Sequence, residues 1–533
     1  MASVGIARSA AVVLGCAILA LSACGSSNTR VSDRPAAALI DPTPGPTHGP
    51  LRMNPQNPRY FLDSCGKAIY LTGSHTWNSF QDWGATDPPP VFDYSKYLDF
   101  LVRHGHNFFR LYVWEQAAWV PWSGERVWFS PMPYQRTGPG IALDGKPRFD
   151  LRKWNDDYFR RLRDRVIEAR DKGIYVAIML FNGWSIDAKI GAMNEERRRR
   201  HRGNPWNGHP YNQANNSNGV NGDPDNSGVG SAVHTLRSPQ IIELQKAYVH
   251  KVIDTVRDLD NVLWEISNES NADARAWEYE VIDFIKAVEG GRGVTHPVGM
   301  TAEYPGGDNA DLFRSHADWV SPSSRTNGPY AVDPPAATEG KVVVTDTDHI
   351  WGTGGNKEWV WKSFTRGLCP ILMDAYEADV SDFYPMYRGD PSAARKNLQS
   401  QDPAWELIRQ QMGRASTLAR RLDLRSLSPR PALSSTGYCL AGNSTYLVYV
   451  PAAQRRGDRW IRRIPANWFP EEVSVNLGGI PGMVHFQWLD PTDNVPLSQG
   501  AVEGGRMRKF PAPRRGGALL LFIYAAGGRP LES

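Results

Sequence analysis

The chain carries almost no net charge for its length. Its 533 residues include 60 Lys and Arg against 56 Asp and Glu, which leaves a formal charge of +4. Nucleic-acid-binding surfaces are usually strongly basic, so the composition gives no electrostatic case for such a partner. Apolar residues make up 41% and charged residues 22%. These ordinary values exclude a chain that is disordered throughout, a collagen-like repeat and a coiled coil.

Cysteine is scarce. The five cysteines contain no C-x-x-C pair, which excludes a zinc ribbon and a thioredoxin-like motif. Cys16 and Cys24 lie near the amino terminus, so the rest of the chain can form at most one disulfide, and we expect none that matters. We expect neither a bound metal nor a cofactor. The segment that begins at Asp223 resembles the start of a calcium-binding EF-hand loop, but its twelfth position is His234 where a bidentate Glu is required, which favours a solvated loop.

The chain has no long apolar run. The apolar run at the amino terminus is short. Residues 10–21 are apolar, follow Arg8 and end in Leu-Ser-Ala-Cys, a pattern too short to span a bilayer comfortably. The tetrapeptide resembles the lipobox of bacterial lipoproteins, which implies that Cys24 becomes the lipidated amino terminus. An ordinary secretory signal is the alternative. We therefore predict a signal peptide over residues 1–24 and a flexible, Pro-rich tether over 25–54. The expected location is the bacterial cell envelope, lipid-anchored to the outer face of the membrane or secreted.

Tryptophan, glycine and proline are plentiful, with 19, 49 and 40 residues. This combination indicates long structured loops that carry flat aromatic faces, and it favours a ligand that stacks on them, unless the tryptophans simply fill the core.

Eight short apolar runs alternate with amphipathic helical stretches after the tether. The runs cover residues 67–77, 107–115, 174–184, 261–269, 297–304, 317–324, 341–350 and 370–376. The spacing of apolar residues predicts helices over 93–104, 154–172 and 238–259. Parallel barrel strands are buried on both faces and read as continuous apolar runs. The pattern therefore predicts an α/β fold, a (β/α)8 TIM barrel over residues 55–424.

The pattern changes from residue 425. Short β runs at 445–450, 472–477, 484–489 and 518–524 are separated by Gly, Pro and Asn, and no helical period appears. Residues 425–533 are predicted to form a small antiparallel β-sandwich.

The predicted strands end in polar and aromatic residues, and the carboxyl ends of barrel strands form the active-site face. Two long connections, 116–150 and 185–237, are expected to build the walls of a cleft. The predicted substrate-binding residues are His75, Trp77, Arg110, Trp114, Asn182, Trp184, Asn268, Trp351 and Asp374.

The fourth run ends in Trp-Glu-Ile-Ser-Asn-Glu at residues 264–269. A glycosidic oxygen is a poor leaving group, so a carboxylic acid must protonate it as the bond breaks. The hexapeptide resembles the acid/base strand of clan-A glycoside hydrolases, such as family 5. The resemblance implies that Glu269 is the catalytic acid/base and that Asn268 holds the sugar 2-hydroxyl. The alternative interpretation is a surface Asn-Glu pair at a strand end that has no catalytic role.

The seventh run contains Thr-Asp-Thr-Asp at residues 345–348. It resembles the Ile-Thr-Glu-Leu-Asp strand of family 10, which implies Asp346 as nucleophile and Asp348 as its support, although Asp replaces the usual Glu. Strand alternation puts both on one face and cannot separate them, and we prefer Asp346. Arg110 matches the clan-A arginine near the nucleophile, where its charge would keep Asp346 ionised, unless it makes a structural ion pair. A retaining mechanism is expected, although the shorter Asp leaves inversion open.

A wider resemblance covers most of the chain after the tether. Residues 57–61, residues 71–77 and the C-terminal β runs resemble apiosidase-like proteins, in which a clan-A-type barrel precedes a collagen-binding-type β-sandwich. The resemblance implies a hydrolase with a carbohydrate substrate, with membrane contact only through the lipid anchor. The alternatives are a non-catalytic glycan-binding lipoprotein on the same barrel and, less favoured, a lyase or transglycosylase. The oligomeric state is left open.

Replacing the lipobox cysteine tests the predicted anchor. Cys24→Ala removes the thiol that would carry the lipid, so the protein should leave the membrane fraction or be mislocalised. Membrane fractionation of the two proteins checks this, and an unchanged distribution would contradict the lipoprotein interpretation.

Overall fold

A computed structural model describes residues 44–186, 203–324, 328–337, 340–376, 403–452, 471–528 and 530–531. The predicted signal peptide, Cys24 and most of the predicted tether lie outside the described residues. In the part of the chain that is described, no helix is both long and apolar enough to cross a membrane. The three cysteines of this part, Cys65, Cys369 and Cys439, form no disulfide with one another.

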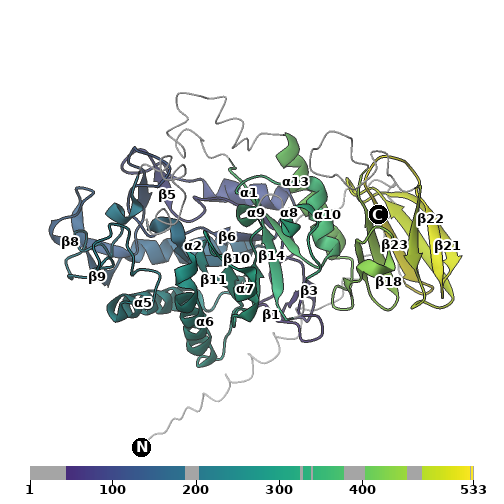
Figure 1. Cartoon of the computed structure of the whole chain (residues 1–533), viewed down its shortest axis with the longest axis horizontal. Coiled ribbons are helices and arrows are strands. Elements are labelled where there is room, and N and C mark those ends of the chain that lie inside the picture. The colour runs from purple at the N-terminus through teal and green to yellow at the C-terminus, as the bar shows by residue number, and fades with distance from the viewer. Residues whose placement is uncertain are drawn as a thin grey trace, which may run out of the picture. The chain divides into compact units, whose positions relative to one another are not determined.

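Eight parallel strands form a nearly closed barrel (Figure 1). In sheet order they run β4-β15-β14-β13-β12-β11-β10-β6. Their bounds are β4 Gly73–His75, β6 Phe108–Leu111, β10 Tyr175–Asn182, β11 Val262–Asn268, β12 Val298–Thr301, β13 Trp319–Ser321, β14 Val342–Asp346 and β15 Cys369–Met373. Each strand overlaps one of the eight predicted apolar runs, which confirms the TIM barrel.

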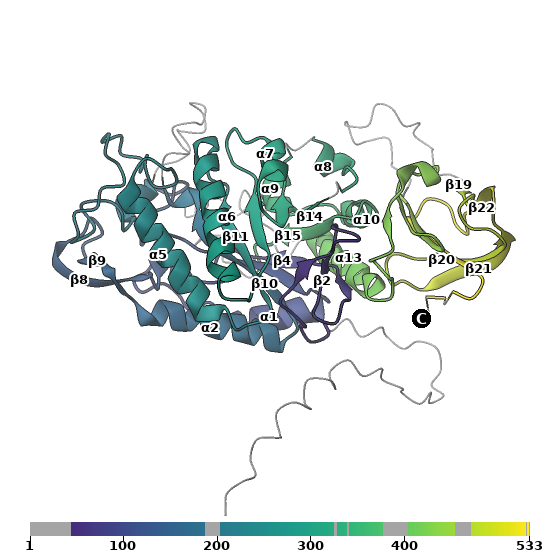
Figure 2. The same ribbon diagram turned by 90° about the horizontal axis from the view of Figure 1, so that it is seen from below.

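Helices cover the outside of this barrel, and the predicted ones are present. The Asp93 side chain accepts a hydrogen bond from the Lys96 N–H at the start of α1, and Ser238 caps α5 in the same way. Figure 2 shows α2, α5 and α6 side by side over β10 and β11. The helix bounds are α1 Tyr94–Arg103, α2 Asp156–Asp171, α5 Pro239–Val256, α6 Arg275–Gly290, α7 Asn309–Arg314, α8 Pro329–Val332, α9 Thr347–Ile350, α10 Lys357–Thr365 and α13 Pro403–Ala419.

The barrel closes where β4 passes against β6. The Asn107 N–H donates to the Thr72 carbonyl at 3.0 Å, and the Asn107 side chain accepts from the Thr72 N–H at 3.0 Å. A Cβ at Gly73 would lie 2.0 Å from the carbonyl oxygen of Phe108. Only glycine permits so close an approach of two backbones.

The first long connection is more ordered than predicted. Instead of a loop, residues 116–154 contain β7 Trp128–Ser130, paired with β5 Asp82–Gly84, and a hairpin of β8 Tyr134–Ile141 and β9 Pro147–Trp154. Half of the hairpin residues are exposed and few are buried, so the strands carry little apolar alternation by which they could have been recognised. In the second connection, residues 203–237 form turns and a short 3-10 helix, Pro205–Gly208, and the Asp223 carboxylate accepts hydrogen bonds from Ser227 and Gly228 of its own loop.

Antiparallel sheets follow the barrel, as the β-sandwich prediction requires. One sheet has the order β16-β17-β18-β23-β20-β21, and β19 pairs with β22. Apolar side chains from both sheets form one cluster, and Trp361 of α10 stacks on Tyr449 of β18 with ring centroids 6.4 Å apart. The bounds are β16 Ser428–Pro429, β17 Cys439–Ala441, β18 Thr445–Val450, β19 Glu472–Asn476, β20 Met483–Leu489, β21 Pro496–Glu503, β22 Met507–Pro511 and β23 Leu519–Ala525. A small sheet of β1 Arg52–Met53, β2 Phe61–Leu62 and β3 Ala68–Ile69 precedes the barrel.

A side chain at the closure should destabilise the barrel. Gly73→Ala places a methyl group against a backbone oxygen that cannot move without shifting β6, at a cost of about 1–3 kcal/mol or more. Thermal unfolding should therefore show a lower midpoint. Gly290→Ala is the control, because a Cβ at this last residue of α6 meets nothing within 4 Å. Equal midpoints for Gly73→Ala and the unmodified protein would contradict the proposed tight closure.

Candidate active site

Arg110 is the centre of a buried network at the carboxyl ends of the second, fourth and seventh barrel strands. Its side chain is fully buried, and Nε donates to Oε2 of Glu265 at 2.8 Å. Nη1 donates to Oδ2 of Asp346 at 2.7 Å and Nη2 to Oδ1 of Asn268 at 2.7 Å. A further contact between Nη2 and Oε1 makes the pairing with Glu265 bidentate. The planar guanidinium thus fixes two carboxylates and one amide in a single geometry.

Asp346, the last residue of β14, is held on all sides. Its Oδ1 accepts from Nε2 of His75 at 2.9 Å and from the backbone N–H of Asp348 at 2.8 Å. Burial raises the pKa of Asp346, but the charges of His75 and Arg110 outweigh burial and keep this pKa well below its usual range. Asp346 is therefore a carboxylate with no exposed side-chain surface.

Asp348 does not lie on the strand face that alternation predicted. The strand ends at Asp346, whose side chain caps the short helix α9, so Asp348 falls in the first turn of that helix. The strand alternation is wrong here because a capping side chain ended the strand two residues early. The side chain of Asp348 is 12% exposed, against 0% for Asp346, and its Oδ2 lies 3.6 Å from Nη1 of Arg110.

Glu269 follows β11 in an unusual backbone conformation. Its φ is 48°, in the left-handed region that non-glycine residues seldom adopt. Its side chain is half-buried, and Oε2 accepts from Nε1 of Trp184 at 2.7 Å. A Cβ at Gly183 would lie 2.4 Å from the carbonyl oxygen of Glu269. The end of β10 thus packs directly against the backbone of Glu269.

Three half-buried aromatic side chains gather at Trp184, the residue that contacts Glu269. The Trp184 ring stacks near Tyr304 with centroids 6.3 Å apart and planes 29° apart, and it meets Trp122 edge-on at 6.0 Å. We call Trp122, Trp184 and Tyr304 the aromatic platform. Flat apolar ring faces of this kind suit the apolar face of a sugar ring. Trp184 is a predicted substrate-binding residue. Trp122 and Tyr304 are not, although Trp122 stands in the long connection 116–150 and Tyr304 ends the fifth apolar run.

Several predicted substrate ligands belong to the core instead. Trp114 is 1% exposed and donates to the Trp77 carbonyl at 2.9 Å, and Trp77 is itself buried. Asn182 donates to the Val113 carbonyl at 3.0 Å, and Asp374 makes a two-point ion pair with Arg409, both distances being 2.7 Å. These buried residues hold strand ends together and offer a sugar almost no surface. Trp351 is half-buried against Trp359.

Three buried residues of the network were not among the predicted ligands. They are Glu265, Tyr112, whose hydroxyl accepts from Nδ2 of Asn268 at 2.6 Å, and His349, whose Nε2 lies 3.3 Å from Oδ1 of Asn268. Burial lowers the pKa of His349 to about 4, so this imidazole is neutral near pH 7. Glu265 lies in the Trp-Glu-Ile-Ser-Asn-Glu segment. Tyr112 follows Arg110 by two residues, so strand alternation places it on the same face and could have identified it.

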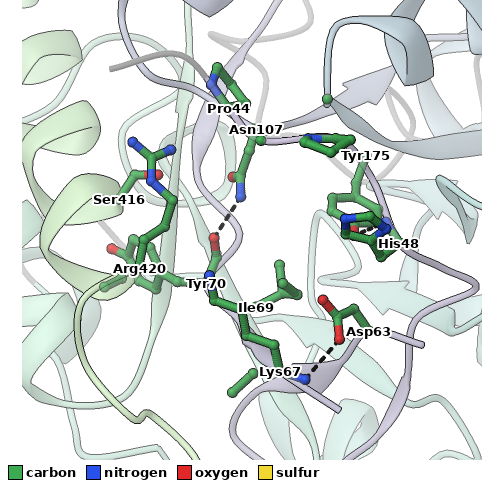
Figure 3. A pocket seen from close by; sticks show the side chains of 15 residues that line it. Pro44, His48, Asp63, Lys67, Ile69, Tyr70, Asn107, Tyr175, Ser416 and Arg420 are labelled. Atoms are coloured by element: carbon green, nitrogen blue, oxygen red, sulfur yellow. Dashed lines mark hydrogen bonds between the residues drawn. The ribbon is translucent and has the colours of Figure 1, made fainter. Parts of the chain in front are cut away.

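A separate cavity of about 240 Å³ lies at the other end of the barrel (Figure 3). Asn107 and Tyr175, which line it, stand at the amino ends of β6 and β10, and Lys67 and Arg420 line it as well. The carboxylates described above are at the carboxyl ends, where barrel enzymes carry their active sites. The cavity is therefore not part of the candidate active site.

Glu303, next to Tyr304, is a buried acid whose ionisation should make the stability of the protein depend on pH. It is 4% exposed, and Oε1 lies 3.6 Å from Nε of Arg275. Burial raises the pKa of Glu303 from 4.5 to about 7, although Arg275 opposes the rise. An acid with a raised folded-state pKa contributes stability that is complete below its unfolded pKa and lost as pH rises through the folded value. The unfolding midpoint should therefore fall between about pH 5 and pH 8, and Glu303→Gln should reduce this fall.

The control for this measurement is Glu243→Gln, at an exposed position of α5. It should leave the pH dependence of the midpoint unchanged. If Glu303→Gln and Glu243→Gln gave the same slope, Glu303 would not titrate in this range.

Known structures share this architecture. A structure described as a glycoside hydrolase is 12% identical, covers 90% of this chain and 98% of its own, and superposes with a TM-score of 0.55. A glycoside hydrolase of family 5 from Bacteroides vulgatus is also 12% identical, with coverage of 90% and 94% and a TM-score of 0.53. Comparison of the sequence with family models and with curated proteins gives no match. At this identity the likeness shows a common fold: the chain has the barrel architecture of these glycoside hydrolases.

Proposed function

We propose that the protein is a glycoside hydrolase that cleaves O-glycosidic bonds of a polysaccharide or glycan by retaining double displacement. One observation carries the proposal. Among the four carboxyl groups around Arg110 and Asn268, the two with exposed surface are Glu269 and Asp348, and they come from the ends of the fourth and seventh strands. Glycoside hydrolysis needs a pair of carboxyl groups that can reach opposite sides of one bond.

Glu269 acts as the acid and then as the base. The indole N–H of Trp184 donates to Oε2 and so orients the carboxyl group that carries the proton to the leaving oxygen. Trp184 also belongs to the aromatic platform, so a sugar stacked there would lie beside the proton donor. This arrangement supports a role for the platform in binding the substrate next to the bond that is cleaved.

Asp348 is the nucleophile in this proposal, in place of the Asp346 that the sequence pattern favours. A nucleophile must contact the anomeric carbon, and Asp346 has no exposed side-chain surface. Its two oxygens are bound by His75, Arg110 and the N–H of Asp348. Asp346 therefore acts as a positioning residue, which fixes the first turn of α9 and with it the backbone of Asp348.

The charge of the network suits the reaction. One guanidinium, Arg110, faces the carboxylates of Glu265 and Asp346, and Asp348 adds a third acidic group nearby. The excess negative charge favours the positive charge that develops at the anomeric carbon in an oxocarbenium-like transition state.

Covalent labelling tests the nucleophile, and leaving-group dependence tests the acid. A mechanism-based fluoro-sugar should label Asp348 in the unmodified enzyme, as mass spectrometry would show. Asp348→Ala should abolish turnover and be rescued by azide. Glu269→Gln should lower kcat by about 10²–10⁴ on poor leaving groups and far less on activated aryl glycosides.

Each other outcome has a definite meaning. A label on Asp346 would exchange the roles of the two Asp residues. Inverted products without a label would mean that a carboxylate of the seventh strand acts as a base that activates water. Glycan binding without turnover across a polysaccharide panel would replace the hydrolase with a non-catalytic glycan-binding protein.

A further inference from the structure

A second buried chain of polar groups lies behind Glu269, and the proposed reaction uses none of its members. The hydroxyl oxygens of Ser267 and Ser270 are 2.6 Å apart, and the Ser270 oxygen lies 3.4 Å from Nδ1 of His234. Nε2 of His234 lies 2.9 Å from Oε1 of Glu115. His234 is 3% exposed and Ser270 is 1% exposed.

The Glu115 carboxyl fixes the direction of these hydrogen bonds. Burial raises the pKa of Glu115, but contacts with His234 and His209 lower it to about 2, so Glu115 is a carboxylate that only accepts. Nε2 of His234 must therefore donate to it. The other ring nitrogen, Nδ1, lies against the Ser270 hydroxyl, which is itself paired with the Ser267 hydroxyl.

Glu115 also holds the turn that carries Trp184. Its Oε1 accepts from the Asn182 N–H at 2.8 Å, and its own N–H donates to the Ser185 hydroxyl at 3.0 Å. These two residues flank Gly183 and Trp184. The indole that contacts Glu269 is thus placed by a turn that is attached to Glu115 at both ends.

Glu269 stands between two anchored neighbours. Asn268 is bound to Arg110 at 2.7 Å, and Ser270 is bound to His234. The Ser270 carbonyl also accepts from the Tyr304 N–H at 2.8 Å. A non-glycine residue with a left-handed backbone conformation needs such support, because that conformation is energetically unfavourable.

We propose that Glu115 and His234 are positioning residues for the proton donor. They fix Ser270 on one side and the turn of Trp184 on the other, so that the Glu269 carboxyl and the indole meet in one geometry. The inference rests on the proposed function, because it assigns these residues to the acid step of that reaction.

The consequence is a selective defect. When the pair is broken, Glu269 should still be present but poorly placed for proton transfer. Hydrolysis of substrates with poor leaving groups should then slow, whereas activated aryl glycosides, which need little protonation, should be cleaved nearly as before. A residue that only stabilised the fold would affect both substrate types equally.

Two variants of the full-length protein test the proposal. His234→Gln and Ser270→Ala should each lower kcat at least about tenfold on a substrate with a poor leaving group and less than about twofold on an activated aryl glycoside, with little change in KM. Ser270→Ala removes one oxygen without adding bulk, so it serves if His234→Gln fails to fold. Ser270→Thr restores the hydroxyl and should recover most of the lost rate.

The matched control is His296→Gln. His296 and Glu289 form a similar buried pair, with Nδ1 and Oε1 2.7 Å apart, but His296 precedes β12 at the amino end of the barrel. Its loss should change both substrates by the same factor. An equal loss on both substrates in His234→Gln and Ser270→Ala, or no loss in folded protein, would overturn the positioning role.

Glu269→Gln, measured in parallel, distinguishes a failure of the positioning role from a failure of the proposed function. A substrate-dependent loss in Glu269→Gln without one in Ser270→Ala would overturn only the role of Glu115 and His234. Absence of hydrolysis by the unmodified protein would overturn the proposed function and this inference together.

Discussion

The buried guanidinium of Arg110 is the constraint on which the carboxyl-end face of the barrel depends. An isolated charge in a dry interior is very unfavourable, and removing one partner of a buried pair typically costs about 3–5 kcal/mol. Arg110 is satisfied because β6, β11 and β14 bring Glu265, Asn268 and Asp346 to it in one register. In the barrel Arg110 pairs with Ala177 of β10, and a slip of one residue would move the guanidinium to the other face of the sheet. The same interaction therefore fixes strand register and the positions of the acidic groups.

The barrel itself was predictable because its strands are short, apolar and separated by helices with clear periodicity. Asp93 and Ser238, at which two of the predicted helices begin, cap α1 and α5 in the structure. The hairpin of β8 and β9 could not be found in the same way, since half of its residues are exposed and few are buried. Pattern-based prediction detects burial, and this hairpin has little of it.

The site was predictable only in part, because a strand-end polar residue has two possible fates. Arg110, Glu269 and Trp184 belong to the group of side chains around the acidic residues. Asn182 and Asp374 are also polar residues at strand ends, yet they bind Val113 and Arg409. Sequence cannot tell which polar groups will be satisfied by neighbours, since that depends on the packing of distant segments. The Thr-Asp-Thr-Asp segment shows a different limit: Asp346 caps α9, so a pattern that looks like continuous strand bends after its second residue.

The close contact between Gly183 and the carbonyl of Glu269 bears on how this barrel could diversify or be engineered. Gly183 opens the second of the two long connections, and long rim loops are where new specificities usually arise. The first residues of this connection are not free to vary, because any side chain at 183 would displace the backbone of Glu269. Loop grafts and libraries should therefore leave this turn intact and begin beyond it, so that the backbone of Glu269 keeps its position.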